Sequence, residues 1–324
     1  MKKKVLAILI CAIMALTLSS CGGTETEDKP AADTYSVGIC QLVQHVALDS
    51  ATQGFKDALN DTLGDQVTFD EQNASGDIPT CSIICNQFVS SNVDLIMANA
   101  TPALQAAQTS TADIPVLGTS VTDYGTALGI DDWSGTTGTN ISGTSDLAPL
   151  DEQAAMLQEL FPDATNVGIL YCSAEPNSKY QYEVVKGHLE GMGYNVKEYT
   201  FSDSNDVQAV TTMAASECDV MYLPTDNTLA SNSEIIKNVC VPAEVPIIAG
   251  EEGICSGCGV ATLSISYYDL GYTTGEMAYE ILVNGADPAT MEIEYAPQFT
   301  KKYNAEISDM LGITMPDDYI AIED

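Results

Sequence analysis

Short apolar runs rich in β-branched residues alternate along this chain with segments whose apolar residues recur at helical spacing, which leaves few folds open to it. The apolar runs predict strands at 35–40, 67–72, 95–98, 116–119, 166–171, 195–200, 220–223, 247–249 and 259–264. The segments between them predict helices at 49–63, 78–90, 103–111, 151–161, 179–192, 206–217, 231–239 and 270–284. Strands that alternate with helices form parallel sheets covered on both faces, so an α/β protein is predicted.

The alternation occurs twice, and each half spans roughly 120 residues, a usual domain size. We therefore predict two doubly wound parallel-sheet lobes joined by a hinge. Lobe 1 is predicted to contain residues 35–146 and 265–292, and lobe 2 residues 147–264 and 293–324. The carboxyl ends of the strands then face the cleft between the lobes, where open α/β sheets bind their ligands.

Residues 1–20 have the three parts of a secretory signal peptide. Lysines at 2–4 precede an apolar run at 5–18, which is too short for a comfortable membrane span of roughly 30 Å. Leu-Ser-Ser-Cys at 18–21 resembles a bacterial lipobox, which implies cleavage before Cys21 and a diacylglycerol on its thiol. The alternative is a plain secreted protein in which Cys21 is an ordinary thiol.

Residues 21–34 are short, polar and acidic, with no periodic apolar residues, so we predict a flexible tether between the lipid and the folded body. Two acyl chains suffice for stable anchoring without a transmembrane helix. The predicted location is the outer face of the cytoplasmic membrane, with the lipid as the membrane contact.

The charge of the chain excludes nucleic acid as a partner. The full sequence has 11 lysines, no arginine, 46 acidic residues and a net charge of −35. Nucleic-acid affinity depends on Lys and Arg displacing counterions, and few are present. The lack of arginine also removes the usual bidentate clamp for a carboxylate. Any anionic group of a ligand must then be held by hydroxyls, backbone N–H groups or helix N-termini.

Eight cysteines follow Cys21, and their spacing leaves several interpretations open. Cys81 and Cys85, like Cys255 and Cys258, could each form a bridge, a redox pair or half of a zinc site. No pair of histidines accompanies them, so we expect no metal and no cofactor. A chain of this length can bury a core without disulfides.

Six polar loops follow the predicted strands and are expected to face the cleft, namely 41–45, 99–102, 120–124, 173–178, 224–228 and 250–253. The motifs in and around them resemble the ABC transporter substrate-binding protein family that includes tryptophan- and tyrosine-binding lipoproteins of Gram-positive bacteria. The resemblance covers nearly all of the mature chain and rests on HVALD at 45–49, NASGD at 73–77, ATPALQAA at 100–107, SVTD at 120–123, GTNISGTSD at 138–146, SAEPNS at 173–178, LPTDN at 223–227 and YYDLGYTTGEMAYEIL at 267–282.

The resemblance implies a type I periplasmic-binding-protein fold with two lobes joined by three crossovers. It also implies capture of a small ligand, an aromatic amino acid in the best-understood members, and its delivery to an ABC permease and its ATPase. The chain departs from the family pattern at Gln44, Val46 and Tyr124, where Glu, Pro and Pro are usual. These positions are in cleft loops, so the departures affect ligand identity; another amino acid, a nucleoside or a sugar is the alternative.

A zwitterionic amino acid needs a carboxylate for its ammonium group and donors for its own carboxylate. We predict that Asp146 and Asp226 contact the ammonium group, and that hydroxyls and helix N-termini replace the missing arginine. The hydroxyls predicted to bind the ligand's carboxylate are those of Thr101, Ser145 and Ser178. The other polar residues predicted to line the binding site are Gln41, His45, Thr122 and Asn177.

Two other classes of function are alternatives to ligand binding. An enzyme is not expected, because there is no G-x-S-x-G or H-E-x-x-H motif and only His45 among the two histidines lies in a cleft loop. Glu251 and Glu252 are adjacent, and adjacent side chains usually point apart rather than act as an acid–base pair. A ligand-sensing lipoprotein partnered with a membrane receptor cannot be separated from a transport protein by this sequence.

Overall fold

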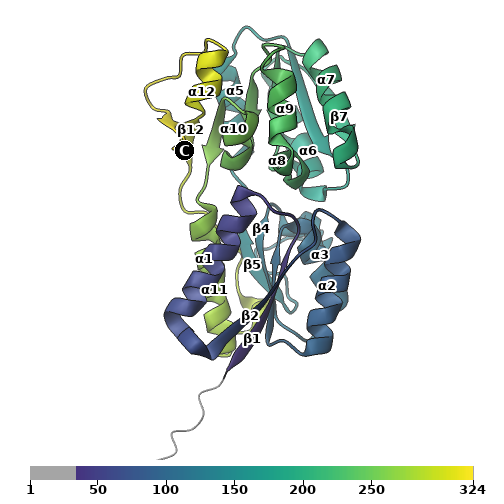
Figure 1. Ribbon diagram of the computed structural model, residues 1–324, viewed down its shortest axis with the longest axis vertical. Coiled ribbons are helices and arrows are strands. Elements are labelled where there is room, and N and C mark those ends of the chain that lie inside the picture. Colours follow the sequence, from purple (N-terminus) through teal and green to yellow (C-terminus); the bar gives the residue numbers. More distant parts are fainter. Residues whose placement is uncertain (1–33, 324) are drawn as a thin grey trace, which may run out of the picture. The chain divides into compact units, whose positions relative to one another are not determined.

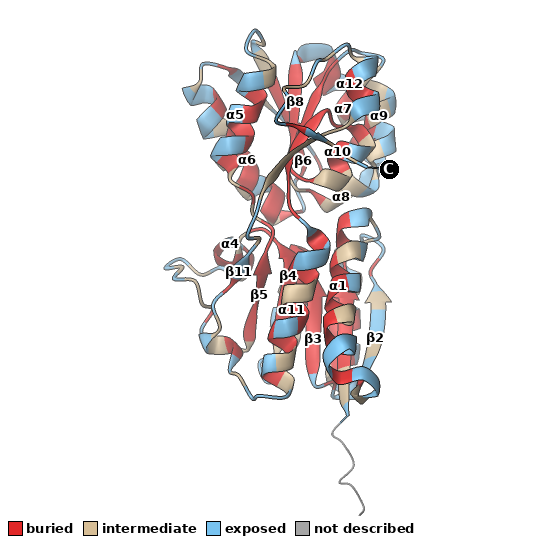
Figure 2. Cartoon of the chain, turned by 90° about the vertical axis from the view of Figure 1, so that its left-hand side faces the viewer, coloured by how far each residue is buried: buried red, intermediate tan, exposed pale blue. Residues whose placement is uncertain are grey.

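The computed structural model describes residues 34–323, whose strands form two sheets (Figure 1). The predicted signal peptide, Cys21 and the tether up to residue 33 lie outside the described residues. Each sheet is sandwiched between helices, and its central strands are fully buried (Figure 2). The predicted α/β architecture of two doubly wound lobes is confirmed. Among the described residues, no helix is long and apolar enough to cross a membrane.

The first sheet is parallel throughout, in the order β11-β5-β4-β3-β1-β2. Its strands are β1 (Tyr35–Gln41), β2 (Val67–Asn73), β3 (Leu95–Asn99), β4 (Val116–Val121), β5 (Ile141–Ser145) and β11 (Glu294–Tyr295). Its helices are α1 (Val46–Leu63), α2 (Ile78–Ser91), α3 (Thr101–Ser110), α4 (Tyr124–Leu128) and α11 (Tyr267–Leu282), with 3-10 turns η1 (Gly64–Gln66) and η3 (Pro288–Thr290).

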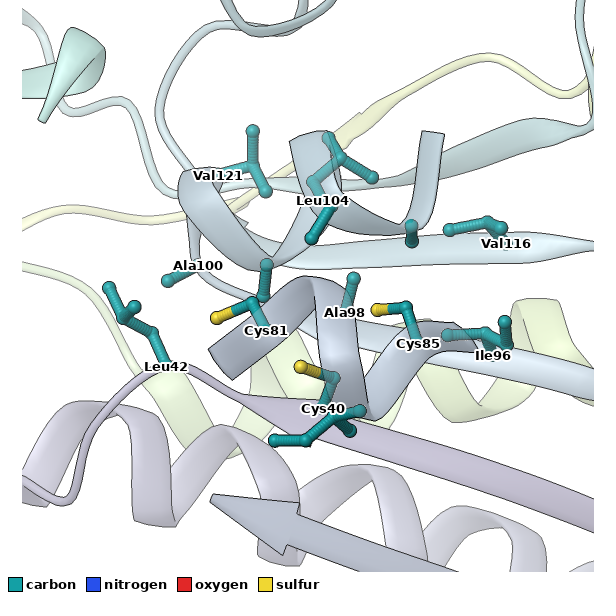
Figure 3. Close-up of a cluster of buried hydrophobic side chains, with 14 of the residues drawn as sticks. Cys40, Leu42, Cys81, Cys85, Ile96, Ala98, Ala100, Leu104, Val116 and Val121 are labelled. Carbon is teal, nitrogen blue, oxygen red and sulfur yellow. The ribbon is translucent and has the colours of Figure 1, made fainter. Parts of the chain in front are cut away.

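The core of this lobe has two layers, one on each face of the first sheet, and alternating side chains of β1 contribute to both. Val37 and Ile39 face α1 and α11, whereas Cys40 faces α2 and α3. Figure 3 shows Cys40 directed toward Cys81 and Cys85 of α2 in this second layer. All eight cysteines of the described residues are buried and free, so neither spaced cysteine pair is bridged here.

The second sheet has the order β13-β12-β10-β9-β8-β6-β7, and only the β10–β12 pairing in it is antiparallel. Its strands are β6 (Asn166–Cys172), β7 (Asn195–Phe201), β8 (Val220–Leu223), β9 (Ile247–Ala249), β10 (Ala261–Ser264), β12 (Thr300–Tyr303) and β13 (Ile320–Ala321). One face packs against α5 (Leu150–Leu160), α6 (Pro176–Gly191) and α12 (Ala305–Met310). The other packs against α7 (Val207–Glu217), α8 (Asn227–Ser231), α9 (Ser233–Cys240) and α10 (Glu252–Cys258), and η2 (Ser204–Asp206) precedes α7.

The chain passes between the two sheets three times. It leaves the first sheet after β5, returns after β10 at the start of α11, and leaves again after β11. β11 (Glu294–Tyr295) pairs with β5, so the last crossover follows Tyr295, whereas the predicted division at 292/293 falls just before this strand. Three crossovers give a hinge that two lobes can move about.

Candidate functional site

The carboxyl ends of strands from both sheets meet around one small pocket between the lobes, which we call the interlobe pocket. Its cavity has a volume of about 10 Å³, close to what a single water molecule needs. Five of the nine ligand-binding residues predicted from the sequence line it, namely His45, Thr122, Asp146, Asn177 and Asp226. Because both lobes contribute, a ligand held here would contact both at once.

The four other predicted residues do not line the interlobe pocket. Gln41 donates through Nε2 to Asp49 Oδ1 at 2.7 Å and braces the start of α1. Ser145 donates to the Thr122 carbonyl at 2.8 Å and fixes the first crossover. Thr101 and Ser178 lie in the first turns of α3 and α6, and both are buried.

Sequence reasoning missed several lining residues, including Ser120, Asn227, Glu251 and Tyr267. The first three lie in loops that were predicted to face the cleft, although other side chains of these loops were selected. Glu251 carried a usable signal, since an acidic residue directly before a short helical run can accept from its free N–H groups. Nothing in the sequence distinguished Tyr267 from a core tyrosine.

The interlobe pocket concentrates polar atoms that have no partner. Within residues 34–323, eight buried side-chain N or O atoms lack a hydrogen bond, and four of these belong to pocket-lining residues. The four are His45 Nδ1, Ser120 Oγ, Asp146 Oδ1 and Asn177 Oδ1. A buried polar group without a partner costs about 1–3 kcal/mol, so such a cluster indicates a site for a polar ligand.

Backbone strain is found at the same place. Ser120, at the end of β4, has a φ of 54°, and Ala100, at the end of neighbouring β3, has a φ of 93°. Positive φ costs a non-glycine residue about 1–3 kcal/mol, and such strain clusters at binding sites. The conformation of Ser120 places its free hydroxyl at the interlobe pocket.

Asp146 is the carboxylate best prepared for a new contact. It is buried, its Oδ2 accepts from the Tyr267 hydroxyl at 3.0 Å, and its Oδ1 has no partner. Burial raises the pKa of Asp146 to about 6, against the lowering effect of the hydrogen bond from Tyr267. A cation placed at Oδ1 would favour the ionised form and satisfy the free oxygen.

Asp226 is already engaged by the backbone. Its Oδ2 accepts from the Cys172 N–H at 2.7 Å, and its Oδ1 accepts from the Leu229 N–H at 2.8 Å at the start of α8. Burial, and then the charge of nearby Glu175, raise the pKa of the Asp226 carboxyl. Asp226 is therefore primarily the N-cap of α8, and it also lines the interlobe pocket.

Glu175 organises the lobe 2 side of the cleft. This buried carboxylate accepts from the backbone N–H groups of Asn227 and Thr228, at 3.0 and 2.9 Å, and from both side chains. Asn227 in turn contacts His45 Nε2 at 3.2 Å, a polar contact that joins the lobes. Burial lowers the pKa of His45, so its ring is neutral near pH 7 and adds no positive charge.

A larger cavity of about 670 Å³ lies beside the crossovers, and we call it the hinge cavity. Glu251 and Tyr267 line both cavities and so separate them. None of the eight unpaired polar atoms found among residues 34–323 belongs to a residue lining the hinge cavity. The interlobe pocket is therefore the better candidate site despite its smaller volume.

The remaining chemistry of the site does not suggest catalysis or metal binding. Glu251 accepts from the Gly253 and Ile254 N–H groups, whereas Glu252 pairs with Lys302 at 2.8 Å, so the two adjacent carboxylates have separate partners and do not form an acid–base pair. Among the described residues, no group of three or more His, Cys, Asp or Glu side chains is placed to hold a metal ion. His188 is an exposed residue of α6.

Comparison with known proteins agrees with this geometry. A model of the family described as ABC transporter substrate binding protein matches residues 36–323. A tyrosine-binding protein from Clostridioides difficile strain R20291 is 37% identical over 291 residues, which cover 86% of this chain and 84% of that protein.

Among solved structures, an ABC domain from Streptococcus pneumoniae in complex with L-Trp superposes with a TM-score of 0.84 at 31% identity, covering 88% of this chain and 97% of that chain. The ligand-free, open structure of a Clostridium difficile substrate-binding protein with adhesive properties superposes with a TM-score of 0.68 at 35% identity, covering 90% of this chain and 99% of that chain. The chain therefore superposes better on the tryptophan complex than on the open structure.

Proposed function

This chain belongs to the ABC transporter substrate binding protein family, and on that premise we propose that it captures a zwitterionic amino acid, preferably an aromatic one, in the interlobe pocket. The family consists of non-catalytic binding proteins, and the chain is the substrate-binding protein of an ABC transporter. The observation that carries the proposal is the group of unpaired, buried polar atoms at this pocket.

Asp146 would bind the ammonium group of the ligand. Its Oδ1 is free and buried, and the hydroxyl of Tyr267 holds the carboxylate in place through Oδ2. A hydrogen bond to a charged group contributes about 1.5–3 kcal/mol when water is excluded. Asp226 is the weaker candidate, since both of its oxygens accept backbone hydrogen bonds.

The carboxylate of the ligand would bind on the lobe 1 side. The helix α1 begins there, after pocket-lining His45, without a side-chain cap, so its first N–H groups are open to an anion. The hydroxyl of Ser120 lies at the end of β4, is buried, and lacks a partner. Hydroxyls and helix N-termini would thus replace the arginine that the chain lacks.

The preference for an aromatic side chain rests on the relatives, of which one is named tyrosine-binding and another was solved with L-Trp. The interlobe pocket contributes one aromatic residue, Tyr267, together with Leu48 and Ala230. An amino acid needs far more room than about 10 Å³, so the lobes must separate to admit the ligand and close around it. Closure would present the permease with a surface that the open form lacks.

The location of the protein is part of the proposal. The signal peptide at 1–20 and the lipobox-like end at Cys21 support a lipid-anchored protein on the outer face of the cytoplasmic membrane of a Gram-positive bacterium. From there it would deliver its ligand to an ABC permease and the associated ATPase. Mass spectrometry of the mature N-terminus would test the anchor, because an unmodified Cys21 would contradict it.

A thermal-shift screen tests the ligand directly. We expect L-tyrosine, L-tryptophan or L-phenylalanine to raise the melting temperature, because a ligand at a hundredfold excess over its Kd stabilises the folded state by about 2.7 kcal/mol. Asp146→Asn should weaken binding by about ten- to a hundredfold. Asp151→Asn, an exposed residue of α5, is the matched control. Shifts with sugars or nucleosides alone would contradict the proposed ligand class.

A further inference from the structure

The buried carboxylate of Glu175 fixes the orientation of two amide side chains at the interlobe pocket. Glu175 Oε2 accepts from Asn227 Nδ2 at 2.7 Å and from Asn177 Nδ2 at 3.3 Å. Asn177 Nδ2 also donates to the Thr225 carbonyl at 3.0 Å. A flipped amide would place its oxygen against these acceptors. In both asparagines the NH2 group therefore faces Glu175, and the amide oxygen faces away from it.

The orientation of Asn227 in turn determines which nitrogen of His45 carries the proton. Asn227 Oδ1 lies 3.2 Å from His45 Nε2, and an amide oxygen can only accept a hydrogen bond. The proton of the imidazole must therefore be on Nε2. Because burial lowers the pKa of His45, the ring is neutral and Nδ1 has a free lone pair. A carboxylate of lobe 2 thus sets the tautomer of a histidine of lobe 1.

This arrangement leaves two acceptors, and no competing donor from the same residues, at the interlobe pocket. His45 Nδ1 and Asn177 Oδ1 are buried, lack partners and belong to residues that line this pocket. The NH2 groups that could have served them are held by Glu175. A buried acceptor without a donor is unfavourable. The missing donor must therefore come from the ligand.

The side chain of the ligand is the group that can supply this donor. In the proposed function Asp146 binds the ammonium group, and the start of α1 with Ser120 binds the carboxylate. Tyrosine has a phenolic O–H on its ring and tryptophan an indole N–H, and both are donors. The ring of phenylalanine has none. The acceptor at His45 thus separates aromatic side chains of similar size by their chemistry.

We propose that His45 determines specificity, its Nδ1 accepting a hydrogen bond from a donor on the aromatic ring of the ligand, and that Glu175 is the positioning residue that makes Nδ1 an acceptor through Asn227. This inference rests on the proposed function and narrows its ligand to aromatic amino acids with a ring donor. His45 and Asn227 come from different lobes, so the acceptor is fixed only when the lobes meet.

Isothermal titration calorimetry with pairs of matched ligands tests the specificity. L-Tyrosine should bind about ten- to a hundredfold more tightly than L-4-fluorophenylalanine, which has a similar shape and no ring donor. L-4-Aminophenylalanine has two N–H donors on its ring and should bind at least as tightly as tyrosine. L-Tryptophan should exceed, by a similar factor, its analogue in which sulfur replaces the indole N–H.

The ratio of the tyrosine and 4-fluorophenylalanine affinities is the quantity to compare between variants. In His45→Phe and in Glu175→Gln the ratio should fall below about fivefold, because the acceptor is removed or no longer fixed. A merely structural role of either residue would weaken both ligands alike and leave the ratio unchanged. Glu183→Gln, an exposed residue of α6, is the matched control and should keep the wild-type ratio.

NMR of the 15N-labelled protein saturated with L-tyrosine measures the tautomer independently of affinity. The chain has only two histidines, and we expect the proton of the His45 ring on Nε2. A proton on Nδ1 would overturn the inference. Equal affinities within both ligand pairs would also overturn it and leave the proposed function intact. Wild-type protein that binds no amino acid would overturn the proposed function itself.

Discussion

Replacement of Gly271 by alanine tests whether the packing of α1 on α11 supports both the fold and the site. The two helices lie side by side in lobe 1 (Figures 1 and 2). A Cβ at Gly271 would lie 1.9 Å from the carbonyl oxygen of Ala51, against about 3.4 Å for an ordinary contact. The helices would have to separate by more than 1 Å at this point.

The expected size of the effect is the difference between two terms. Alanine in a helix interior gains about 0.5–1 kcal/mol over glycine. Overpacking a tight core costs about 1–3 kcal/mol, occasionally more, and the clash here is with rigid backbone. We expect Gly271→Ala to lower the free energy of unfolding by about 2 kcal/mol, a fall in Tm of roughly 4–8 °C.

Urea unfolding followed by circular dichroism measures this change, and Gly187→Ala is the matched control. Gly187 lies in α6, where a Cβ would meet no atom within 4 Å, so alanine there should stabilise the protein by about 0.5–1 kcal/mol. The same stabilisation in Gly271→Ala would refute the reasoning. Because α1 starts after His45 and α11 starts at Tyr267, ligand binding should weaken as well.

Three further changes have defined outcomes. In the ligand-free protein the raised pKa of Asp146 means that the folded state binds more protons than the unfolded state between about pH 4 and 6. The free energy of unfolding should therefore fall by about 3 kcal/mol as the pH rises through that window. In Asp146→Asn, urea unfolding at a series of pH values should show no such fall. Tyr267→Phe removes the donor to Asp146 and should cost about 1–3 kcal/mol in the same assay, while a change under 0.5 kcal/mol would show that the hydrogen bond is unimportant. Lys302→Ala breaks a partly exposed pair with Glu252 and should change stability by less than about 1 kcal/mol, so a larger loss would contradict a surface role.

Most of the fold was predictable because its strands are buried on both faces and read as continuous apolar runs. The run at 35–40, for example, corresponds to β1 (Tyr35–Gln41). The strand β5 (Ile141–Ser145) was missed because its sequence, ISGTS, is polar and contains glycine, although every residue in it is buried. The Thr144 hydroxyl bonds to Thr119 of β4 and Thr274 of α11, and the two serine hydroxyls donate to carbonyls of neighbouring loops, which a single sequence does not show.

The site was predictable only to the level of loops. Strand ends indicate which loops face the cleft, but local hydrogen bonding decides which side chains are free. Asp226 and Asp146 look equivalent in the sequence, yet the backbone engages both oxygens of Asp226 and leaves Oδ1 of Asp146 open. Local bonding also decides the position of Gln41, since its amide braces α1 through Asp49, and its part in ligand binding stays a prediction.

A crystal structure of the protein grown with L-tyrosine would test the central claim most directly. We expect tyrosine in the interlobe pocket with its amino group about 3 Å from Asp146 Oδ1 and its carboxylate at the hydroxyl of Ser120. Tyrosine bound only in the hinge cavity, or with its carboxylate toward Asp146, would contradict the account.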